Sequence, residues 1–251
     1  MSLANITHTR TPKPPKLVVY GGAKVGKSSF AAGAPSPIFI RTEDGLDALD
    51  VPAFPLASSW ADVLGSIGAL AEEEHEFRTV VLDSLDWAEP LAWQAVAKTA
   101  GVADIEKVGG GYGKGYQEAI RLWRDLLDGL DWLRNHRQMG VVVICHDEIR
   151  RHEPPDGDAF DVAGLKLHKR ASALVTEWAD VIGYARVKRA VKKSDAGFGK
   201  EHARAVGMGA RLLTVGQNPA YLSGNRYGLP DDLELSWDAF EAALAATRRT
   251  A

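Results

Sequence analysis

An eight-residue stretch near the N-terminus, GGAKVGKS at residues 21–28, constrains the fold more than any other part of this chain. It matches the pattern G-x-x-x-x-G-K-[ST], with the apolar run LVVY directly before it and the segment SSFAAG after its lysine. A strand before and a helix after are the context in which this pattern forms a phosphate-binding loop. The glycines let backbone N–H groups turn inward around phosphate oxygens, and the helix N-terminus adds a partial positive charge. The stretch therefore predicts a nucleotide site at the end of a buried strand.

The residues of this loop have different expected roles. The Lys27 ammonium is expected to reach the β- and γ-phosphates, and the Ser28 hydroxyl to ligate Mg²⁺. Lys24 is a second cation in the loop, and the sequence leaves open whether it meets phosphate or solvent. The predicted nucleotide-binding residues are Gly21, Gly22, Ala23, Lys24, Val25, Gly26, Lys27, Ser28 and Ser29.

Short apolar runs and segments of helical spacing alternate along the rest of the chain. Trp60, Leu64, Ile67 and Leu70 form one helical stripe with Ser59 as its N-terminal cap, and residues 119–133 form another. The apolar runs lie at 17–20, 37–40, 79–83, 141–145 and 179–187, with a later one at 211–216 and a final helix that Ser236 caps. Most do not alternate with polar residues, which is typical of strands buried on both faces. The order predicts an α/β fold with a mostly parallel, doubly wound sheet flanked by helices.

Composition fits one large domain. The chain has 251 residues and is 45% hydrophobic, so we expect a single domain over residues 17–251 after an extended, proline-containing arm over residues 1–16. The single cysteine, Cys145, lies in the apolar run VVVIC, so it is expected to be buried and excludes an internal disulfide. No run of about 18 apolar residues and no apolar leader segment occurs. These features favour a cytoplasmic protein that does not span a membrane.

The charge of the chain is unevenly distributed. Its net charge is −3, which does not by itself indicate a nucleic-acid partner. Residues 186–211, however, hold eight Lys or Arg residues against two acidic ones. The polar, glycine-containing segment KKSDAGFGKEH at 192–202 lies between two strand-like runs. We expect a basic C-terminal β-hairpin here, with residues 192–202 as its loop.

Polar residues at the ends of three predicted strands complete the candidate nucleotide site. Asp83 ends the run TVVLD, and an acid at this position can hold Mg²⁺ directly or through water. Glu43, in the turn RTEDG, is expected to orient or deprotonate the attacking water, with Asp44 as its rival. His146 follows VVVIC and is expected to hydrogen-bond to the γ-phosphate, because ligands bind at the carboxyl ends of such strands. No cluster of Cys and His has zinc spacing, and no G-x-S-x-G motif occurs.

The order GGAKVGKS, TEDG, VVLDS and VVVICH resembles the RecA-like P-loop ATPases. Within them it is most similar to the phage and prophage ATP-binding proteins that include the Sak-type RecA-like single-strand annealing proteins. The resemblance covers residues 17–240 of the chain. It implies a RecA-like P-loop NTPase fold, ATP and Mg²⁺ as cofactors, and a homo-oligomeric ring or filament in the cytoplasm of a bacterial host cell. It also implies that Glu43 is the catalytic glutamate and His146 the polar sensor.

The resemblance adds a catalytic arginine. In such ATPases a K-x-R pair often reaches the γ-phosphate of a neighbouring subunit, and the segment SGNRYGLP at 223–230 resembles the segment that carries it. Arg226 matches the arginine, whose planar charge suits a transition-state phosphate. Gly224 stands at the lysine position, so half of the pair is missing.

The resemblance also implies DNA-binding loops after the Asp83 strand and the His146 strand. The first region contains GGGYGKGYQ at 109–117, which is not a second phosphate-binding loop because Gly115 stands where a hydroxyl is required and no apolar strand precedes it. We expect this loop to offer aromatic rings and a cation to single-stranded DNA, and the second loop to offer cations to phosphates. The basic hairpin competes for the same role. The candidate DNA-binding residues are Tyr112, Lys114, Tyr116, Arg150, Arg151, Lys166, Lys169 and Arg170.

These features together favour an ATPase that assembles as a ring or filament and acts on single-stranded DNA in phage-type recombination or annealing. One alternative is a nucleotide-gated assembly or binding module with little turnover. Another is a helicase-like or loader ATPase of replication. A small-molecule kinase would share the phosphate-binding loop, but the sequence has no clear acceptor pocket or arginine-rich lid.

Overall fold

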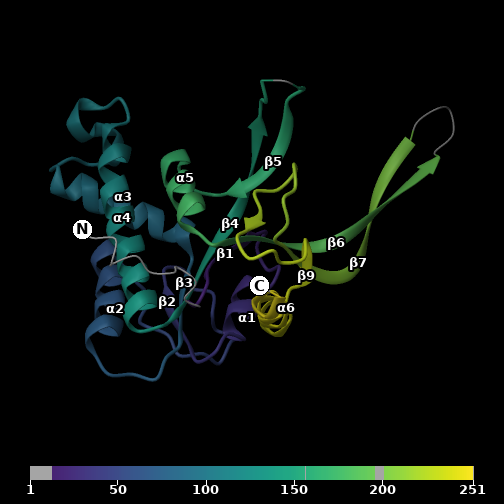
Figure 1. Cartoon of the computed structure of the whole chain (residues 1–251). Coiled ribbons are helices and arrows are strands. Elements are labelled where there is room, and N and C mark those ends of the chain that lie inside the picture. Colours follow the sequence, from purple (N-terminus) through teal and green to yellow (C-terminus); the bar gives the residue numbers. More distant parts are fainter. Residues whose placement is uncertain (1–12, 156, 196–200, 251) are drawn as a thin grey trace, which may run out of the picture.

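The apolar runs form the centre of one large mixed sheet. The computed structural model describes residues 13–155, 157–195 and 201–250. Along the sheet the strands follow the order β2-β3-β4-β1-β6-β7-β9 (Figure 1). The first five are mutually parallel, whereas β7 runs antiparallel to β6 and β9 antiparallel to β7. Their bounds are β1 (Lys16–Gly21), β2 (Pro37–Arg41), β3 (Thr79–Asp83), β4 (Gly140–His152), β6 (Val181–Asp195), β7 (Glu201–Thr214) and β9 (Asp232–Glu234).

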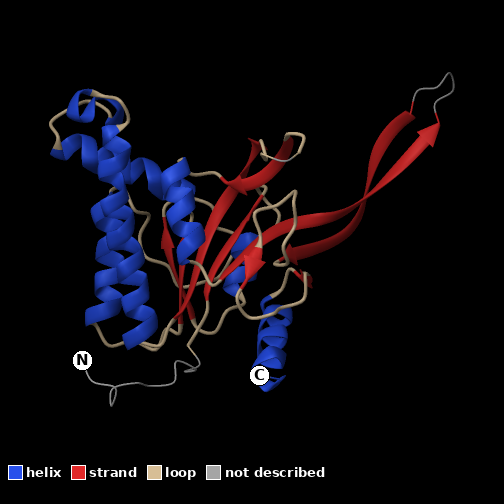
Figure 2. Cartoon of the chain, turned by 45° about the horizontal axis from the view of Figure 1, so that its top comes forward, coloured by secondary structure: helices blue, strands red, loops and turns tan. Residues whose placement is uncertain are grey.

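Helices cover both faces of this sheet (Figure 2). One face packs against α2 (Trp60–Glu72), α3 (Leu85–Thr99), α4 (Lys114–His136) and α5 (Lys169–Trp178). The other face packs against α1 (Lys27–Ala32) and α6 (Trp237–Thr250). The α/β fold with a mostly parallel sheet flanked by helices is therefore confirmed.

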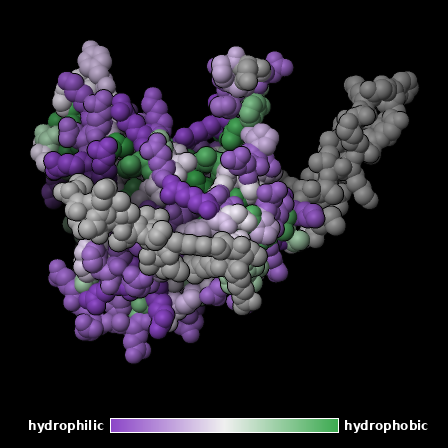
Figure 3. Space-filling view, in the orientation of Figure 1, coloured by the Kyte–Doolittle hydropathy of each residue, from purple (hydrophilic) through white to green (hydrophobic). Residues whose placement is uncertain are grey.

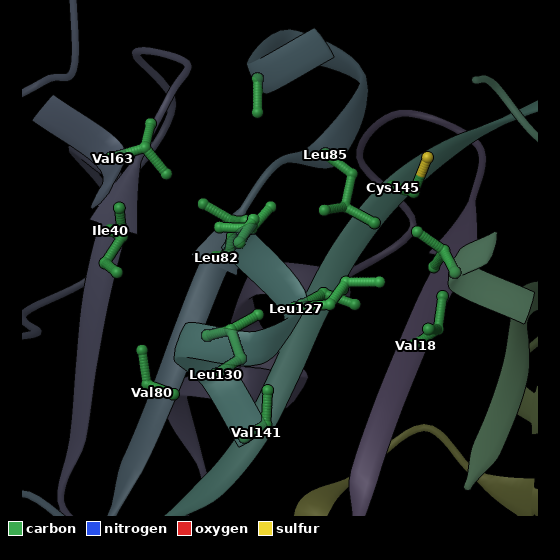
Figure 4. Packing of buried hydrophobic residues seen from close by; sticks show 14 of the residues in the cluster. Val18, Ile40, Val63, Val80, Leu82, Leu85, Leu127, Leu130, Val141 and Cys145 are labelled. Atoms are coloured by element: carbon green, nitrogen blue, oxygen red, sulfur yellow. The ribbon is translucent and has the colours of Figure 1, made fainter. Parts of the chain in front are cut away.

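The non-alternating pattern of the strands is explained by burial on both sides. In β1, Val18 and Tyr20 face the cluster formed with α2 to α5, whereas Leu17 and Val19 face the cluster formed with α1 and α6. Figure 4 shows part of the first cluster, where side chains of β2, β3 and β4 meet those of α2 and α4. Cys145 belongs to this cluster and is buried, as predicted.

Local signals predicted from the sequence are present at two helix starts. The Ser59 hydroxyl accepts a hydrogen bond from the backbone N–H of Asp62 (3.2 Å), and the Asp62 carboxylate accepts one from the backbone N–H of Ser59 (2.9 Å). This reciprocal capping box fixes the beginning of α2. At α6, the Ser236 hydroxyl accepts from the backbone N–H of Ala239 at 3.3 Å.

The predicted C-terminal hairpin is present, formed by β6 and β7, but its strands are longer than expected. Residues 192–195 and 201–202, predicted as part of its loop, belong to these strands, because β6 continues to Asp195 and β7 begins at Glu201; residues 196–200 lie outside the described part of the chain. The region after the His146 strand, predicted as a loop, is a second hairpin, because β4 continues to His152 and pairs antiparallel with β5 (Phe160–Leu165). In both regions the apolar run ends while the backbone hydrogen bonds continue. Figure 1 shows the β6–β7 hairpin projecting away from the rest of the chain.

Two helices and one short strand of the structure were not predicted from the sequence. Helices α3 and α5 had no predicted counterpart, and the small strand β8 (Gly224–Asn225) pairs with the beginning of β6. Residues 1–12 of the predicted arm lie outside the described residues. Within the residues that are described, no helix has the length and apolar character needed to cross a membrane.

Candidate nucleotide-binding site

The predicted phosphate-binding loop follows β1 at the carboxyl edge of the sheet. The loop begins tightly against β6, since a Cβ atom built on Gly21 would lie 2.3 Å from the Ala185 carbonyl oxygen. It ends at Gly26, whose φ of 112° is a conformation that glycine adopts without strain, and α1 follows directly. Glycine is therefore required at both ends of the loop.

The Lys27 side chain lies inside this loop. Its ammonium donates hydrogen bonds to the carbonyl oxygens of Gly21 (2.9 Å) and Gly22 (3.0 Å). Burial lowers the pKa of Lys27, while the nearby Asp83 carboxylate acts in the opposite direction. By contrast, Ala23, Lys24 and Ser29 are exposed, and the Val25 side chain is buried in the core.

Asp83 and Ser28 form the second part of the site. The Ser28 hydroxyl donates to Oδ2 of Asp83 at 2.7 Å. Oδ1 of Asp83 is buried and has no hydrogen-bond partner among the described residues. Burial raises the pKa of Asp83, although the Ser28 hydrogen bond and the Lys27 charge act against it. A buried carboxylate oxygen without a partner, beside a hydroxyl, is a donor set that suits a hard cation such as Mg²⁺.

Glu43 is brought close to Asp83 by two hydrogen bonds that the sequence did not reveal. The Thr42 hydroxyl donates to the Ser84 carbonyl oxygen (2.6 Å) and accepts from the Ser84 backbone N–H (2.8 Å), which ties the end of β2 to the end of β3. Burial, and then the nearby Asp83 carboxylate, raises the pKa of Glu43. The rival Asp44 is exposed.

His146 is held by a residue that sequence reasoning missed. Nδ1 of His146 lies 2.9 Å from Oδ2 of Asp86, and the backbone N–H of His146 donates to Oδ1 of Asp86 at 3.0 Å. The Ser84 hydroxyl also donates to Oδ1 of Asp86, at 2.9 Å. The side-chain hydrogen bond to Asp86 raises the pKa of His146. Burial alone would raise the pKa of Asp86, but the hydrogen bonds and charge of His146, together with the hydrogen bond from Ser84, lower it. The signal for Asp86 was its position in the first turn after Ser84, where helices favour acids.

The structure thus brings Lys27, Ser28, Glu43, Asp83 and His146 to one edge of the sheet, and Arg226 to the opposite edge. Arg226 contacts Asp180 through its side chain (3.3 Å) and its backbone N–H, and it donates to the Glu177 carbonyl oxygen at 2.8 Å. Asp180 precedes β6 and accepts from the backbone N–H of Lys16, where β1 begins. Arg226 therefore lies far from the phosphate-binding loop of its own chain, and its action on a neighbouring subunit stays a prediction.

The candidate DNA-binding residues of 109–117 differ in how they are held. Tyr112 is 99% exposed, and the Lys114 ammonium donates to the Gly109 carbonyl oxygen at 2.9 Å. Tyr116 is half-buried, stacked on the His168 ring at 4.4 Å and in edge contact with the Trp93 ring at 5.4 Å. A Cβ atom on Gly115 would lie 2.1 Å from the Ile105 carbonyl oxygen, so close packing explains the glycine at this position.

The second candidate region contributes to a pocket of about 650 Å³ between α3, the beginning of α4 and the β4–β5 hairpin. Trp87, Trp93 and Tyr116 line it together with Arg150, Lys166 and Lys169. In Figure 3 hydrophobic side chains are visible in the hollow between the helices and this hairpin. Arg150 contacts Glu148 and the Leu167 carbonyl oxygen, Arg151 pairs with Asp161 at 3.5 Å, and Lys166, Lys169 and Arg170 are exposed.

Comparison with known proteins gives a family match over most of the chain. The model of the family described as AAA domain matches residues 13–227. Among curated proteins, the SPbeta prophage-derived uncharacterized protein YorG of Bacillus subtilis (strain 168) is 25% identical over 176 residues, which are 67% of this chain and 49% of that protein. The chain therefore spans about half the length of the curated relative that it matches.

Two solved structures resemble the chain at low identity. The crystal structure of the RadB recombinase is 14% identical, with a TM-score of 0.49 over 90% of each chain. The flagellar accessory protein FlaH from Methanocaldococcus jannaschii is 10% identical, with a TM-score of 0.42 over 88% of this chain and 84% of that one.

Proposed function

The chain belongs to the AAA domain family, and we propose that it is a Mg²⁺-dependent ATPase that acts on single-stranded DNA as a homo-oligomeric ring or filament. The prophage origin of the curated relative supports a phage setting. Within it, our proposal places the chain in phage-type recombination or annealing, of the Sak type, in the cytoplasm of a bacterial host. The observation that carries the ATPase part is the meeting of Lys27, Ser28, Asp83, Glu43 and His146 at one sheet edge. Each has the chemistry that its position in phosphoryl transfer requires.

The residues divide the chemistry among them. Ser28 and Asp83 would hold Mg²⁺, which would neutralise charge on the phosphates of the nucleotide. Lys27 places a buried positive charge where the transferred phosphoryl group gains negative charge. Glu43 orients the attacking water and accepts its proton, and Asp86 fixes the ring of His146 so that it can contact the γ-phosphate.

Replacing Glu43 by Gln tests whether the chain turns ATP over through this glutamate. The amide keeps the size of the side chain but cannot accept the proton, so we expect turnover to fall by about 100-fold while the Kd for ATP changes by less than about 3-fold. A steady-state phosphate-release assay and a calorimetric titration measure the two quantities. Asp44→Asn is the matched control, because Asp44 is the adjacent exposed carboxylate. If Asp44→Asn lost turnover and Glu43→Gln kept it, the assignment of the general base would be wrong. If neither variant lost turnover, a nucleotide-gated module with little turnover would be favoured.

The DNA part of the proposal is supported by the surface around α3 and α4. The exposed Tyr112 ring and the pocket lined by Trp87 and Trp93 offer aromatic faces, and the pocket holds three cations beside the carboxylates of Asp86, Glu89 and Glu148. Single-stranded nucleic acids bind to aromatic faces and cations through base stacking and phosphate contacts. This surface is connected to the ATP site, because Asp86 and Trp87 are neighbours in the first turn of α3.

The double variant Tyr112→Ala, Lys114→Ala tests which surface binds DNA. We expect the Kd for a labelled oligo-dT to rise by at least about 5-fold and the stimulation of ATP hydrolysis by DNA to be lost, while basal hydrolysis is kept. Fluorescence anisotropy at low salt and phosphate release with and without DNA are the measurements. Lys98→Ala, an exposed lysine on α3, is the control. Should Lys192→Ala, Lys193→Ala lower DNA affinity instead, the basic hairpin would be the DNA site; wild-type protein that neither binds DNA nor responds to it would refute the DNA proposal.

A further inference from the structure

Arg211, on strand β7, lies against the phosphate-binding loop. A Cβ atom built on Gly26 would lie 3.0 Å from Nη1 of Arg211 and 3.8 Å from its Cδ. Arg211 belongs to β7, where it pairs with Val187 of β6. Its carbonyl oxygen accepts a hydrogen bond from the backbone N–H of Leu235 at 3.0 Å. The backbone that carries this guanidinium is therefore fixed on both sides.

Unlike the neighbouring arginines, the Arg211 guanidinium has no acidic partner in the part of the chain that the structure describes. The side chain is exposed, and within the described residues no hydrogen bond or ion pair is formed by its guanidinium. Arg186, on the adjacent strand, donates to the Thr214 hydroxyl (2.7 Å) and pairs with Asp232 (2.9 Å). Arg226 is paired with Asp180. Of these three arginines, only Arg211 lies against the loop and also has no acidic partner among the described residues.

The strand order shows which end of a nucleotide Arg211 would meet. Glu43 follows β2, Asp83 ends β3 and His146 lies within β4, and these three strands are all on one side of β1. Because Ser28 and Asp83 are the candidate Mg²⁺ ligands, the β- and γ-phosphates of a bound nucleotide are expected on that side. β6 and β7 lie on the other side of β1, so the nucleoside end is expected to point toward them. Arg211 also faces the side of the sheet that α1 covers, because its paired neighbour Val187 and Leu235 pack into that cluster.

We propose that Arg211 binds the nucleoside end of ATP in the site of its own chain, through a guanidinium contact with the ribose or base. A planar guanidinium offers both N–H donors and a flat cationic face, which suit ribose oxygens and an aromatic base respectively. This proposal rests on the ATPase function proposed above and adds a nucleotide contact to it. Arg211 does not touch the reacting phosphate, so it contributes to binding and not to the chemical step.

Three ligands separate this contact from its alternatives: Mg·ATP, Mg·ADP and inorganic tripolyphosphate with Mg²⁺. For Arg211→Ala we expect calorimetry to show a Kd about 10-fold higher for both ATP and ADP, and a Kd for tripolyphosphate within about 3-fold of wild type. In turnover assays KM for ATP should rise by a similar factor while kcat stays within about 2-fold, because the lost contact is equal in the ground state and the transition state. Arg124→Ala, an exposed arginine on α4, is the control and should match wild type.

Two results would overturn the assignment. One is unchanged ATP affinity; the other is an equal loss for all three ligands, which would mean that Arg211 supports the loop at Gly26 without contacting the nucleoside. Arg211→Gln keeps much of the packing against Gly26 without the charge. If Arg211→Ala does not fold, Arg211→Gln should show the changes in Kd that are expected for Arg211→Ala. Failure of the ATPase proposal itself looks different, because wild-type protein would then bind neither ATP nor ADP.

Discussion

Replacing Lys27 by Ala is expected to lower ATP turnover by at least about 100-fold, because a fixed positive charge at the transferred phosphoryl group is lost. The ammonium is buried inside the phosphate-binding loop, within hydrogen-bond distance of the Gly21 and Gly22 carbonyl oxygens. The neighbouring Lys24 is exposed, so it does not supply the same buried charge. Phosphate release under saturating ATP measures the effect.

The same change is expected to leave the fold intact. Burial lowers the pKa of Lys27, which means that the folded state disfavours the charged form relative to the unfolded chain. Removing the ammonium therefore removes an unfavourable desolvation, and the melting temperature should stay within a few degrees of wild type. Lys98→Ala, an exposed lysine on α3, should change neither quantity. Turnover of Lys27→Ala close to that of the wild type would show that the loop is not the hydrolytic site.

The sequence was sufficient to predict the parts of the site that local pattern determines. The phosphate-binding loop needs a strand, two glycines and a helix within a few residues, and the strand ends carrying Glu43, Asp83 and His146 follow from runs buried on both faces. Parallel strands then bring those ends to one edge without any further information.

The missed residues act through contacts between distant segments. Asp86 holds His146 from 60 positions earlier in the chain, and Arg211 reaches Gly26 only because β7 lies beside β6. Neither contact leaves a periodic or composition signal. The β4–β5 hairpin and the full length of the predicted β6–β7 hairpin were missed for a related reason. Once a two-stranded ribbon extends beyond the helices, polar residues suffice, because the backbone hydrogen bonds of β4–β5 and β6–β7 need no apolar face.

The second large effect is expected in the core between α2 and α4. Trp123→Ala should lower the free energy of unfolding by about 3–5 kcal/mol, the usual cost of truncating a large buried aromatic side chain. Trp123 is 1% exposed and meets the Trp60 ring edge to face, with ring centroids 5.8 Å apart. The pair joins two helices whose apolar stripes the sequence predicted, so the change removes the contact that fixes one helix on the other. Urea unfolding followed by circular dichroism measures the loss.

Two further variants separate packing from other causes. Trp132→Ala on the same helix removes a ring that is 41% exposed and stacked on His136, so we expect a loss of about 1 kcal/mol or less. Trp123→Phe keeps a ring in the core and removes the indole N–H, which is buried without a hydrogen-bond partner among the described residues, so its loss should be clearly smaller than that of Trp123→Ala. Equal losses for Trp123→Ala and Trp132→Ala would contradict a core formed between α2 and α4. If Trp123→Ala lowered the free energy of unfolding only slightly and kept turnover, packing on the other face of the sheet, which α1 covers, would contribute most of the stability.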